Sequence, residues 1–571
     1  MSRREAWLTV ALVGGVALLV RGLAASLVPF PIPEDTAYYY GVARNLIEGR
    51  GLVSDAVWSF QTPPLVSPPR PAFEVWMPLP TLIAAIPMAV LGTGYRAAQI
   101  VPVLLGSVIP ILTWRLAFDV AAERGLTLAR ARVLAVGAGL TAAVELPLVL
   151  HSTLPDSTAL FAVFVLAACL LMTRILARPR AATWRETWRD PRVAGLGLAF
   201  GLAALTRNEA IWLAGTWVLI VLAMARRRPK GQVGAQAQQL FASEVRGRTN
   251  LGRTAALRLI VVPAVIALAV FAPWAARNWV AFGSPLPGQA VTNAFSVTGF
   301  DIFAFQDPPT LARYLAVGPA RLLDMRIEGF EHNLLTVLLI PSFPVGLIGL
   351  VALAWFGRGR MLRPLLFVSL ITFAFTTLVF PVATTWGTYL HAAGSAHVLL
   401  IIGCLFALDA LIVRIGRFRG WTRPVAWLGP ALTVFAAAMF SLVFLPGFGG
   451  QSREVATRYP ALQEQLAAAG IRVEGMGPVI SDFPIWWAEA LRAPALGLPD
   501  EDPENILALA RAFPGTRYLV MSSTDHGHWP AVLDAGGRDA ACFREIALVP
   551  PSDPAAQSAL RDTRVFELVC T

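Results

Sequence analysis

The sequence predicts a polytopic α-helical membrane protein that carries an α/β domain at its C-terminus. Hydrophobic residues make up 56% of the 571 residues and charged residues only 15%, whereas soluble domains are about 25% charged. The mean hydropathy is +0.60. Apolar runs such as Leu334–Phe356 and Val425–Leu445 are each long enough to cross a hydrocarbon core of roughly 30 Å.

The net charge of +11 is distributed in the way that membrane proteins distribute it. Residues 451–571 hold ten Arg and sixteen Asp or Glu and contribute −6, so the rest of the chain carries +17. That excess lies in short loops between apolar runs, including 174–192 with six Arg and 226–258 with eight basic residues against one acid. This is the positive-inside pattern. It argues against nucleic-acid binding, which would gather the charge on one soluble face.

The first apolar run, Trp7–Phe30, follows a basic N-terminus. Its length, the presence of Arg21 within it and the spans that follow predict a transmembrane helix rather than a signal peptide. With the N-terminus in the cytoplasm, the acidic first loop (30–78) is extracytoplasmic. The run Leu79–Leu91 would invert every later basic loop if it crossed the membrane. Because it is also short, we expect it to be a juxtamembrane helix on the outer face.

This assignment of the loops to the two sides of the membrane gives about eleven spans, with the C-terminus outside and the protein in the plasma membrane. They cover roughly residues 7–29, 97–119, 131–150, 157–176, 193–208, 210–225, 258–277, 334–357, 364–383, 394–413 and 425–445.

The region after the last predicted span is expected to be a separate extracytoplasmic domain, with a transmembrane module at 1–449 and the domain at 450–571. Extended, β-branched segments (GPVISDF, TRYLVMSS, CFREIAL and TRVFELV) alternate there with helical ones (ALQEQLAAAG, IWWAEALRA and PENILALARAF). Alternation of this kind predicts an α/β sheet.

Two of the four cysteines, Cys542 and Cys570, lie in this predicted domain. Each lies at the end of a predicted strand, and pairing of neighbouring strands would bring the thiols within bonding distance. We expect a disulfide, with two separate buried thiols as the alternative. Cys169 and Cys404 lie inside apolar runs and are expected to be packing residues.

Polar residues gather at the outer ends of the predicted helices. Glu34 and Asp35 adjoin three tyrosines in PEDTAYYY, and Glu74 precedes the juxtamembrane helix. The remaining members of this outer set are His151 and Asp156 in HSTLPD, Arg207 in LTRNEA, Arg277 and Asn278 in PWAARNW, and His391.

Each of these residues also has a structural interpretation. Asp156 before Ser157 fits a helix cap, Arg277 fits an interfacial side chain whose charge reaches water, and the two histidines fit structural roles. Arg207 is harder to explain in this way, because it separates two apolar runs with almost no polar linker, where a charge is costly without a partner. Acids and an arginine at one depth indicate chemistry on an anionic, membrane-borne substrate.

With these motifs in view, the sequence resembles the C-type (GT-C) glycosyltransferases, in the branch with protein O-mannosyltransferases and lipid A aminoarabinose transferases. The resemblance covers roughly residues 1–445 and is carried by PEDTAYYYGVARNLIEGRGL, FEVWMPLP, LPDS, LTRNEA and PWAARNW. It implies transfer of a sugar from a polyprenyl-phosphate carrier to an extracytoplasmic protein, lipid or glycan, usually with inversion.

The resemblance also implies roles for the outer residues. An acid of the first loop would be the general base for the acceptor hydroxyl, and Arg207 would bind the lipid phosphate. The family has Asp followed by Glu, whereas this chain has Glu34 followed by Asp35, so which carboxylate is the base stays open. The predicted catalytic residues are Glu34, Asp35 and Asp156. The predicted substrate-binding residues are Glu74, Arg207, Arg277, Asn278, His151 and His391.

The chemistry fits these residue types independently of the resemblance. A hydroxyl nucleophile needs a carboxylate within hydrogen-bond reach, and a guanidinium can stabilise the charge that develops on a departing phosphate. The lipid-linked sugar is a co-substrate, and no other cofactor is expected. The sequence has no metal-ligand cluster of recognisable spacing, and a divalent-metal requirement stays open.

The main alternative is a transporter or a lipid or polysaccharide flippase. Such a protein would place ionisable groups near the membrane midplane and often shows inverted repeats. Here the charges lie at outer helix ends, and the sequence shows no internal repeat.

Overall fold

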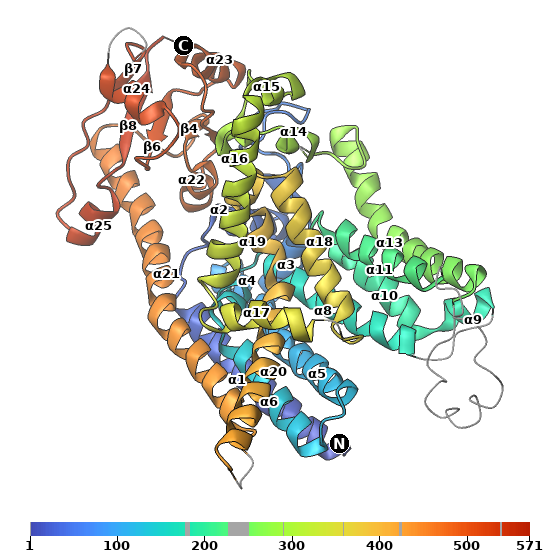
Figure 1. The fold of residues 1–571 in the computed structure, drawn as a ribbon. Coiled ribbons are helices and arrows are strands. Elements are labelled where there is room, and N and C mark those ends of the chain that lie inside the picture. The colour runs from blue at the N-terminus through green and yellow to red at the C-terminus, as the bar shows by residue number, and fades with distance from the viewer. Residues whose placement is uncertain are drawn as a thin grey trace, which may run out of the picture.

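The computed structural model describes residues 2–177, 183–225, 251–288, 290–357, 359–421, 425–536 and 540–570. Helices dominate, and a small sheet lies at the end of the molecule opposite to the N-terminus (Figure 1). The long helix α21 (Leu428–Ala468) runs from the helical bundle into that end. The other helices of the bundle and its loops are α1 (Arg3–Ser26), α2 (Glu34–Ile47), α3 (Leu79–Leu91), α4 (Tyr95–Gly106), α5 (Val108–Glu123), α6 (Leu128–Val144), α7 (Leu146–Leu150), α8 (Thr158–Ala177), α9 (Trp184–Arg189), α10 (Pro191–Ala204), α11 (Ala210–Ala225), α13 (Arg253–Phe282), α14 (Ala290–Ala294), α15 (Leu311–Ala316), α16 (Gly318–Glu331), α17 (Val345–Phe356), α18 (Arg363–Val379), α19 (Thr388–Ala392) and α20 (Gly394–Phe418).

Six helical segments in the described part of the chain are long and apolar enough to cross a membrane, or seven if the bent pair α6–α7 forms one span. They are α1, the stretch Tyr95–Glu123 that contains α4 and α5, α8, α13, α20 and α21. Five shorter apolar helices accompany them: α3, α10, α11, α17 and α18. The chain is a multi-pass membrane protein, whereas the count of eleven spans and the outer position of Leu79–Leu91 stay predictions.

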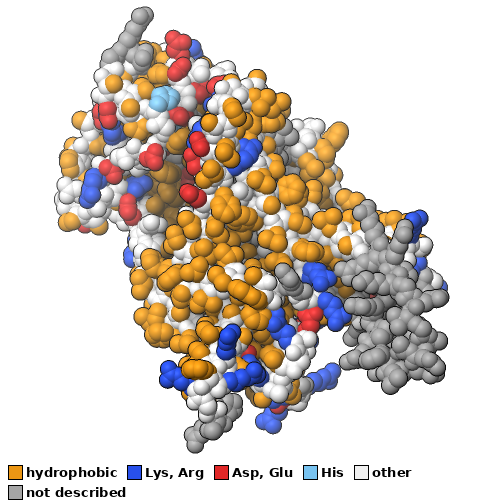
Figure 2. Space-filling view, viewed as in Figure 1, with side chains coloured by type: hydrophobic (Ala, Val, Ile, Leu, Met, Phe, Trp, Pro, Cys, Tyr) orange, Lys and Arg blue, Asp and Glu red, His pale blue; other side chains and the backbone are white. Residues whose placement is uncertain are grey.

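The surface agrees with a membrane setting. On the face shown in Figure 2, apolar side chains form a broad band across the middle of the molecule. Lys and Arg gather near the end that holds the N-terminus, and most Asp and Glu lie toward the C-terminal end. Which end faces the cytoplasm stays a prediction from the positive-inside pattern.

The apolar run Leu334–Phe356 is not one continuous helix, and its crossing of the membrane stays a prediction. A π-helix, η4 (His332–Leu339), ends before α17 begins at Val345. Pro341 and Pro344 lie in the break. Neither proline can donate a backbone N–H, which is why a continuous helix fails there despite a uniformly apolar sequence.

The C-terminal region contains the predicted sheet. Its strands are ordered β2-β5-β4-β6-β8-β7. The first four strands in this order are parallel to one another, and β8 is antiparallel to its two neighbours, β6 and β7. A separate two-stranded sheet pairs β1 (Val53–Ser54) with β3 (Arg70–Pro71). The strands of the larger sheet are β2 (Ala56–Val57), β4 (Val479–Ser481), β5 (Ala495–Gly497), β6 (Tyr518–Met521), β7 (Phe543–Glu545) and β8 (Arg564–Leu568). Its helices are α22 (Pro484–Leu491), α23 (Pro503–Ala512), α24 (Trp529–Ala535) and α25 (Pro554–Ala559).

Alternate residues of these strands face two different apolar clusters, as the two-residue period of a strand requires. Ile480 and Leu519 pack with Trp529 on one face. Val479 and Val520 face a cluster that continues through α21 and α22 to α2 in the first loop. The sheet of the C-terminal tail (residues 450–571) and α2, the helix that carries the acidic pair, therefore share one apolar cluster to which α22 also contributes.

The predicted domain boundary at residue 450 falls inside a continuous helix, because α21 extends through it to Ala468. In addition, β2 comes from the first loop and pairs with β5 of the tail, with Ala56 opposite Ala495. The division into 1–449 and 450–571 and the outer location of the tail stay predictions. The first loop and the tail nevertheless share one sheet.

The predicted disulfide between Cys542 and Cys570 is present. Antiparallel pairing of β7 with β8 places the two cysteines side by side, and the N–H of Val569 donates to the carbonyl of Cys542. Among the described cysteines, Cys169 and Cys404 are free and buried, as expected for packing residues.

We expect Cys542→Ser to lower the free energy of unfolding by about 2–4 kcal/mol, because a bridge across 28 residues restricts the unfolded chain. Thermal melts of the purified protein, with and without reductant, measure this effect. Alkylation without reductant followed by intact-mass analysis is the control. Labelling of both tail cysteines in the native protein would contradict the bridge.

Candidate active site

Asp35 lies in the first turn of α2, where the positive end of the helix dipole favours an acid. Its Oδ1 accepts the N–H of Thr36 at 2.8 Å. Its Oδ2 lies 3.1 Å from Nε2 of His391 on α19. Both side chains are 11% exposed. The first loop and a loop more than 300 residues later in the chain thus meet at one carboxylate–imidazole contact.

His391 is held from its other side by α8. Its Nδ1 lies 2.7 Å from Oγ1 of Thr158, the first residue of that helix. Asp156 accepts the N–H of Thr158 at 2.9 Å and also contacts Nδ1 of His151 at 3.1 Å. Asp156 therefore has the capping role that its position suggests, and it also joins the predicted polar cluster.

Arg207 lies between α10 and α11 and completes this cluster. It binds both carboxylate oxygens of Glu209, at 3.1 Å from Nε and 2.7 Å from Nη2. Its Nη1 donates to Oγ of Ser157 at 2.8 Å, and Nη2 lies 3.4 Å from the carbonyl of Thr388. The guanidinium is thus fixed against the same two segments that hold His391.

The charges in this cluster influence one another strongly. Burial and the carboxylate of Asp156 raise the pKa of Asp35 to about 7. The N–H of Thr36, Arg207 and His151 act in the opposite direction. Burial, Arg207 and His151 hold the pKa of His391 well below its usual value, so this imidazole is neutral at physiological pH. A carboxylate that titrates near neutrality is suited to accept a proton.

Three side chains of the cluster have the donor types that bind divalent cations. One ligand atom each from His151, Asp156 and His391 lies within 4.8 Å of the others. Sequence spacing did not reveal this group, because His391 is distant in the chain. Two imidazoles and a carboxylate fit the ligand preferences of transition metals, and the divalent-metal requirement stays open.

Glu34 does not join this cluster, although it is adjacent to Asp35. Its Oε1 accepts the N–H of Ile485 at 3.0 Å and lies 3.4 Å from the N–H of Trp486, both in the first turn of α22. The two acids that the sequence predicts to act together therefore contact different parts of the protein.

Glu74, Arg277 and Asn278 form a second polar group. Arg277 donates to the carbonyls of Ala72 at 2.8 Å and Leu52 at 3.3 Å. Glu74 is 1% exposed and lies 4.0 Å from Nη2 of Arg70. Burial raises the pKa of Glu74, and Arg70 opposes that change.

Asn278 is directed at the loop that follows α13, because its Nδ2 lies 3.5 Å from the carbonyl of Pro285. The contacts of this second group are mostly to backbone carbonyls of the first loop and its neighbours. The predicted substrate-binding residues thus divide between two places.

Sequence reasoning missed several partners that position the cluster. Ser157 and Thr158 directly follow the LPD motif, and Glu209 lies within LTRNEA, so their proximity to candidate residues was the available signal. Thr388 contributes a backbone carbonyl, which no sequence pattern marks.

The fold and the cluster define a class of protein: a polytopic helical membrane protein with a partly buried cluster of acid, imidazole and guanidinium groups. No model of a known protein family matches the chain, and no curated protein sequence matches it. Solved structures do match. A crystal structure of ArnT from Cupriavidus metallidurans bound to undecaprenyl phosphate is similar with a TM-score of 0.54, at 13% identity over 98% of each chain.

The apo form of the same ArnT matches with a TM-score of 0.53 and 15% identity, over 99% of this chain and 98% of that one. The archaeal oligosaccharyltransferase AglB from Archaeoglobus fulgidus matches at 0.46 and 12% identity, over 91% of this chain and 69% of AglB. The chain has the fold of ArnT.

Proposed function

We propose that this protein is a membrane glycosyltransferase that moves a sugar from a polyprenyl-phosphate carrier to a hydroxyl group of an extracytoplasmic acceptor, with inversion. The observation that carries the proposal is the carboxylate of Asp35, which is only 11% exposed and lies 3.1 Å from His391 in the cluster that holds Arg207. The fold shared with ArnT, which was crystallised with undecaprenyl phosphate, supports a lipid-linked donor.

In the proposed reaction, Asp35 takes the proton of the acceptor hydroxyl while that oxygen bonds to the anomeric carbon. The bond from this carbon to the phosphate oxygen breaks, and the lipid phosphate leaves with the electron pair. Arg207 stabilises the charge that develops on the phosphate, since a fixed guanidinium in a water-poor site interacts strongly with an oxyanion. One base suffices for inversion, and no covalent nucleophile is required.

The other residues of the cluster have supporting roles in this proposal. Neutral His391 donates from Nε2 to Asp35, and Thr158 donates to Nδ1 of His391, which fixes that tautomer. Asp156 holds His151 and the start of α8.

For the second polar group we propose a different contribution. Arg277 fixes the first loop through backbone carbonyls. We therefore propose that Glu74, Arg277 and Asn278 shape the acceptor side of the site without contacting the reacting atoms.

The experiment that tests the function uses the purified protein in lipid vesicles with a radiolabelled polyprenyl-phosphate sugar. A transferase releases polyprenyl phosphate and passes the label to an acceptor supplied on the outer side. The rival transporter or flippase would move the intact lipid between leaflets without cleaving it. Transbilayer movement of uncleaved donor, with no release of lipid phosphate, would reject the transferase.

We expect the transfer rate to fall as the pH decreases through about 7. A general base acts only when deprotonated, and burial together with Asp156 raises the pKa of Asp35 to about 7. A carboxylate with the ordinary pKa of about 4 would keep its activity down to mildly acidic pH. The measurement is kcat against pH at saturating donor. If kcat did not change between about pH 5 and 8, Asp35 would not be the base.

A further inference from the structure

The tail is attached to α2 at several points, and the first of them is Glu34. Its carboxyl group is partly buried and accepts the N–H of Ile485 at 3.0 Å and that of Trp486 at 3.4 Å. These N–H groups lie in the first turn of α22, where a helix has no internal partners for its amides. Glu34 thus joins the N-terminus of α2 to the N-terminus of α22.

The same two helices are joined again farther along. Arg44 of α2 and Glu489 of α22 form an ion pair whose side chains are 7% and 6% exposed. The helices approach closely at Gly41, where an added Cβ would lie 2.9 Å from Oε2 of Glu489. Just beyond the C-terminal ends of the two helices, Arg492 pairs with Glu48 at 2.6 Å in an exposed position. The contacts with α22 therefore extend along most of α2.

We propose that Glu34 is a positioning residue: through α22 of the tail it fixes the start of α2 and thereby holds Asp35 against His391. This inference rests on the proposed function, because it assigns the base to Asp35. It also gives the C-terminal region a role in catalysis. The tail contributes no reacting group in this proposal, but it fixes the position of Asp35.

The electrostatics of Glu34 fit this role. Burial raises the pKa of Glu34 to about 8, and the carboxylates of Asp482 and Asp35 add to the effect. The two N–H groups of α22 act in the opposite direction without cancelling it. At pH 7 the group is therefore mostly protonated. A neutral carboxyl group still offers an oxygen to the amides of α22, and the amide of a glutamine does the same.

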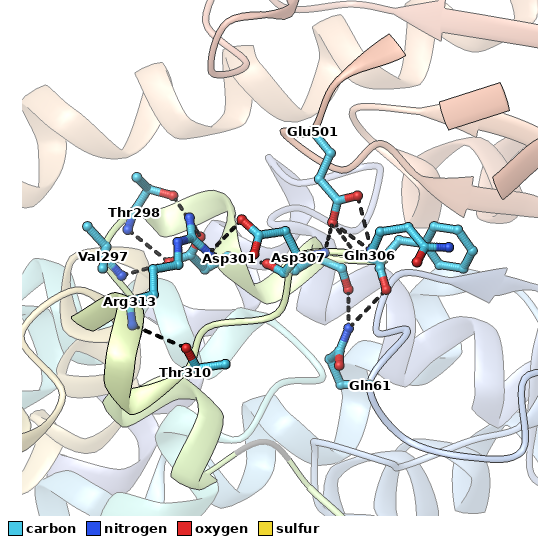
Figure 3. Close-up of polar contacts among 11 residues, drawn as sticks. Gln61, Val297, Thr298, Asp301, Gln306, Asp307, Thr310, Arg313 and Glu501 are labelled. Atoms are coloured by element: carbon cyan, nitrogen blue, oxygen red, sulfur yellow. Dashed lines mark hydrogen bonds and ion pairs between the residues drawn. The ribbon is translucent and has the colours of Figure 1, made fainter. Parts of the chain in front are cut away.

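The tail has another carboxylate anchor, which provides a control. Glu501 accepts the N–H groups of Phe305, Gln306 and Asp307 at 2.7, 2.9 and 3.0 Å. Figure 3 shows Glu501 reaching from the tail onto this loop, with Gln61 of the first loop on the other side. Loss of this anchor weakens attachment of the tail at a place distant in sequence from α2.

The test compares Glu34→Gln, Glu34→Ala and Glu501→Ala in the full-length protein, with kcat, donor binding and melting temperature as readouts. We expect Glu34→Gln to keep kcat close to the parent. Glu34→Ala should lower kcat by about 10²-fold, because a displacement of about 1 Å at a catalytic group has that effect. Donor affinity should be unchanged, and Glu501→Ala should lower the melting temperature without a comparable loss of kcat.

A second readout separates positioning from general destabilisation. If α2 is released in Glu34→Ala, Asp35 gains water, and the acidic limb of its pH–rate profile should shift to lower pH. A well-folded but inactive Glu34→Gln variant would overturn the proposal, because it would make Glu34 the base. Full activity of Glu34→Ala would overturn it as well. Unchanged activity of Asp35→Asn would reject Asp35 as the base. Failure of the parent protein to release lipid phosphate from the donor would instead reject the proposed function, so the failures are distinguishable.

Discussion

Replacing Asp35 with Asn is expected to lower kcat by about 10²–10⁴-fold, the usual contribution of a general base. Asparagine has nearly the same shape, and its Oδ1 still accepts a hydrogen bond from Nε2 of His391, which lies 3.1 Å from the carboxylate. The variant should therefore fold and bind donor normally while losing the ability to take a proton. The measurements are single-turnover transfer from labelled donor and donor binding at equilibrium.

The matched control for this variant is Glu34→Gln, the same chemical change at the neighbouring residue. Its carboxyl oxygen contacts only backbone N–H groups of α22 among the hydrogen bonds found for it, so the amide should suffice. A large loss of rate in Asp35→Asn alone assigns the base. Near-parental turnover of Asp35→Asn at every pH would refute this assignment.

Arg207→Lys is expected to raise the KM for the donor roughly 10–100-fold, which corresponds to the loss of about 1.5–3 kcal/mol of charge-assisted hydrogen bonding. The guanidinium binds both oxygens of Glu209 and also reaches Ser157. An ammonium keeps the charge but cannot reproduce this planar set of donors. Because the charge is kept, Glu209 is not left as an unpaired buried carboxylate, and the fold should persist.

Initial rates at varied donor concentration and a thermal melt separate the effect on the donor from an effect on folding. Arg492→Lys is the matched control, since Arg492 pairs with Glu48 on the exposed side of α22. Such exposed pairs contribute at most about 1 kcal/mol. An unchanged KM for the donor in a folded Arg207→Lys variant would mean that Arg207 does not contact the phosphate.

Local sequence patterns predicted the membrane character, several spans and the strands of the tail. Hydropathy and β-propensity act over 5 to 20 neighbouring residues, so the segments that became α8, α13, α20 and β8 could be identified without tertiary structure. The same logic did not reveal the break within Leu334–Phe356, where two prolines outweigh an apolar composition. It also failed to find β2, because two residues of a loop become a strand only when β5 is beside them.

The candidate site was predictable only as a set of residues at one depth. Acids, histidines and an arginine at outer helix ends stand out in an apolar sequence, and five of the predicted residues lie in one cluster of short contacts: Asp35, His151, Asp156, Arg207 and His391. Glu209, which was not predicted, joins them through Arg207. Their pairing was not predictable. Asp35 and His391 come from opposite halves of the chain, and no local pattern links them.

The sequence by itself determined that this chain enters a membrane many times and that most of its charged groups lie outside its apolar runs. Burial of charge in lipid is costly wherever the chain folds. Only the tertiary structure decided which groups Glu34 and Asp35 each contact. Successive residues of a helix point about 100° apart, so the two acids face different neighbours. Asp35 meets the imidazole of His391, whereas Glu34 meets the unpaired amides of α22.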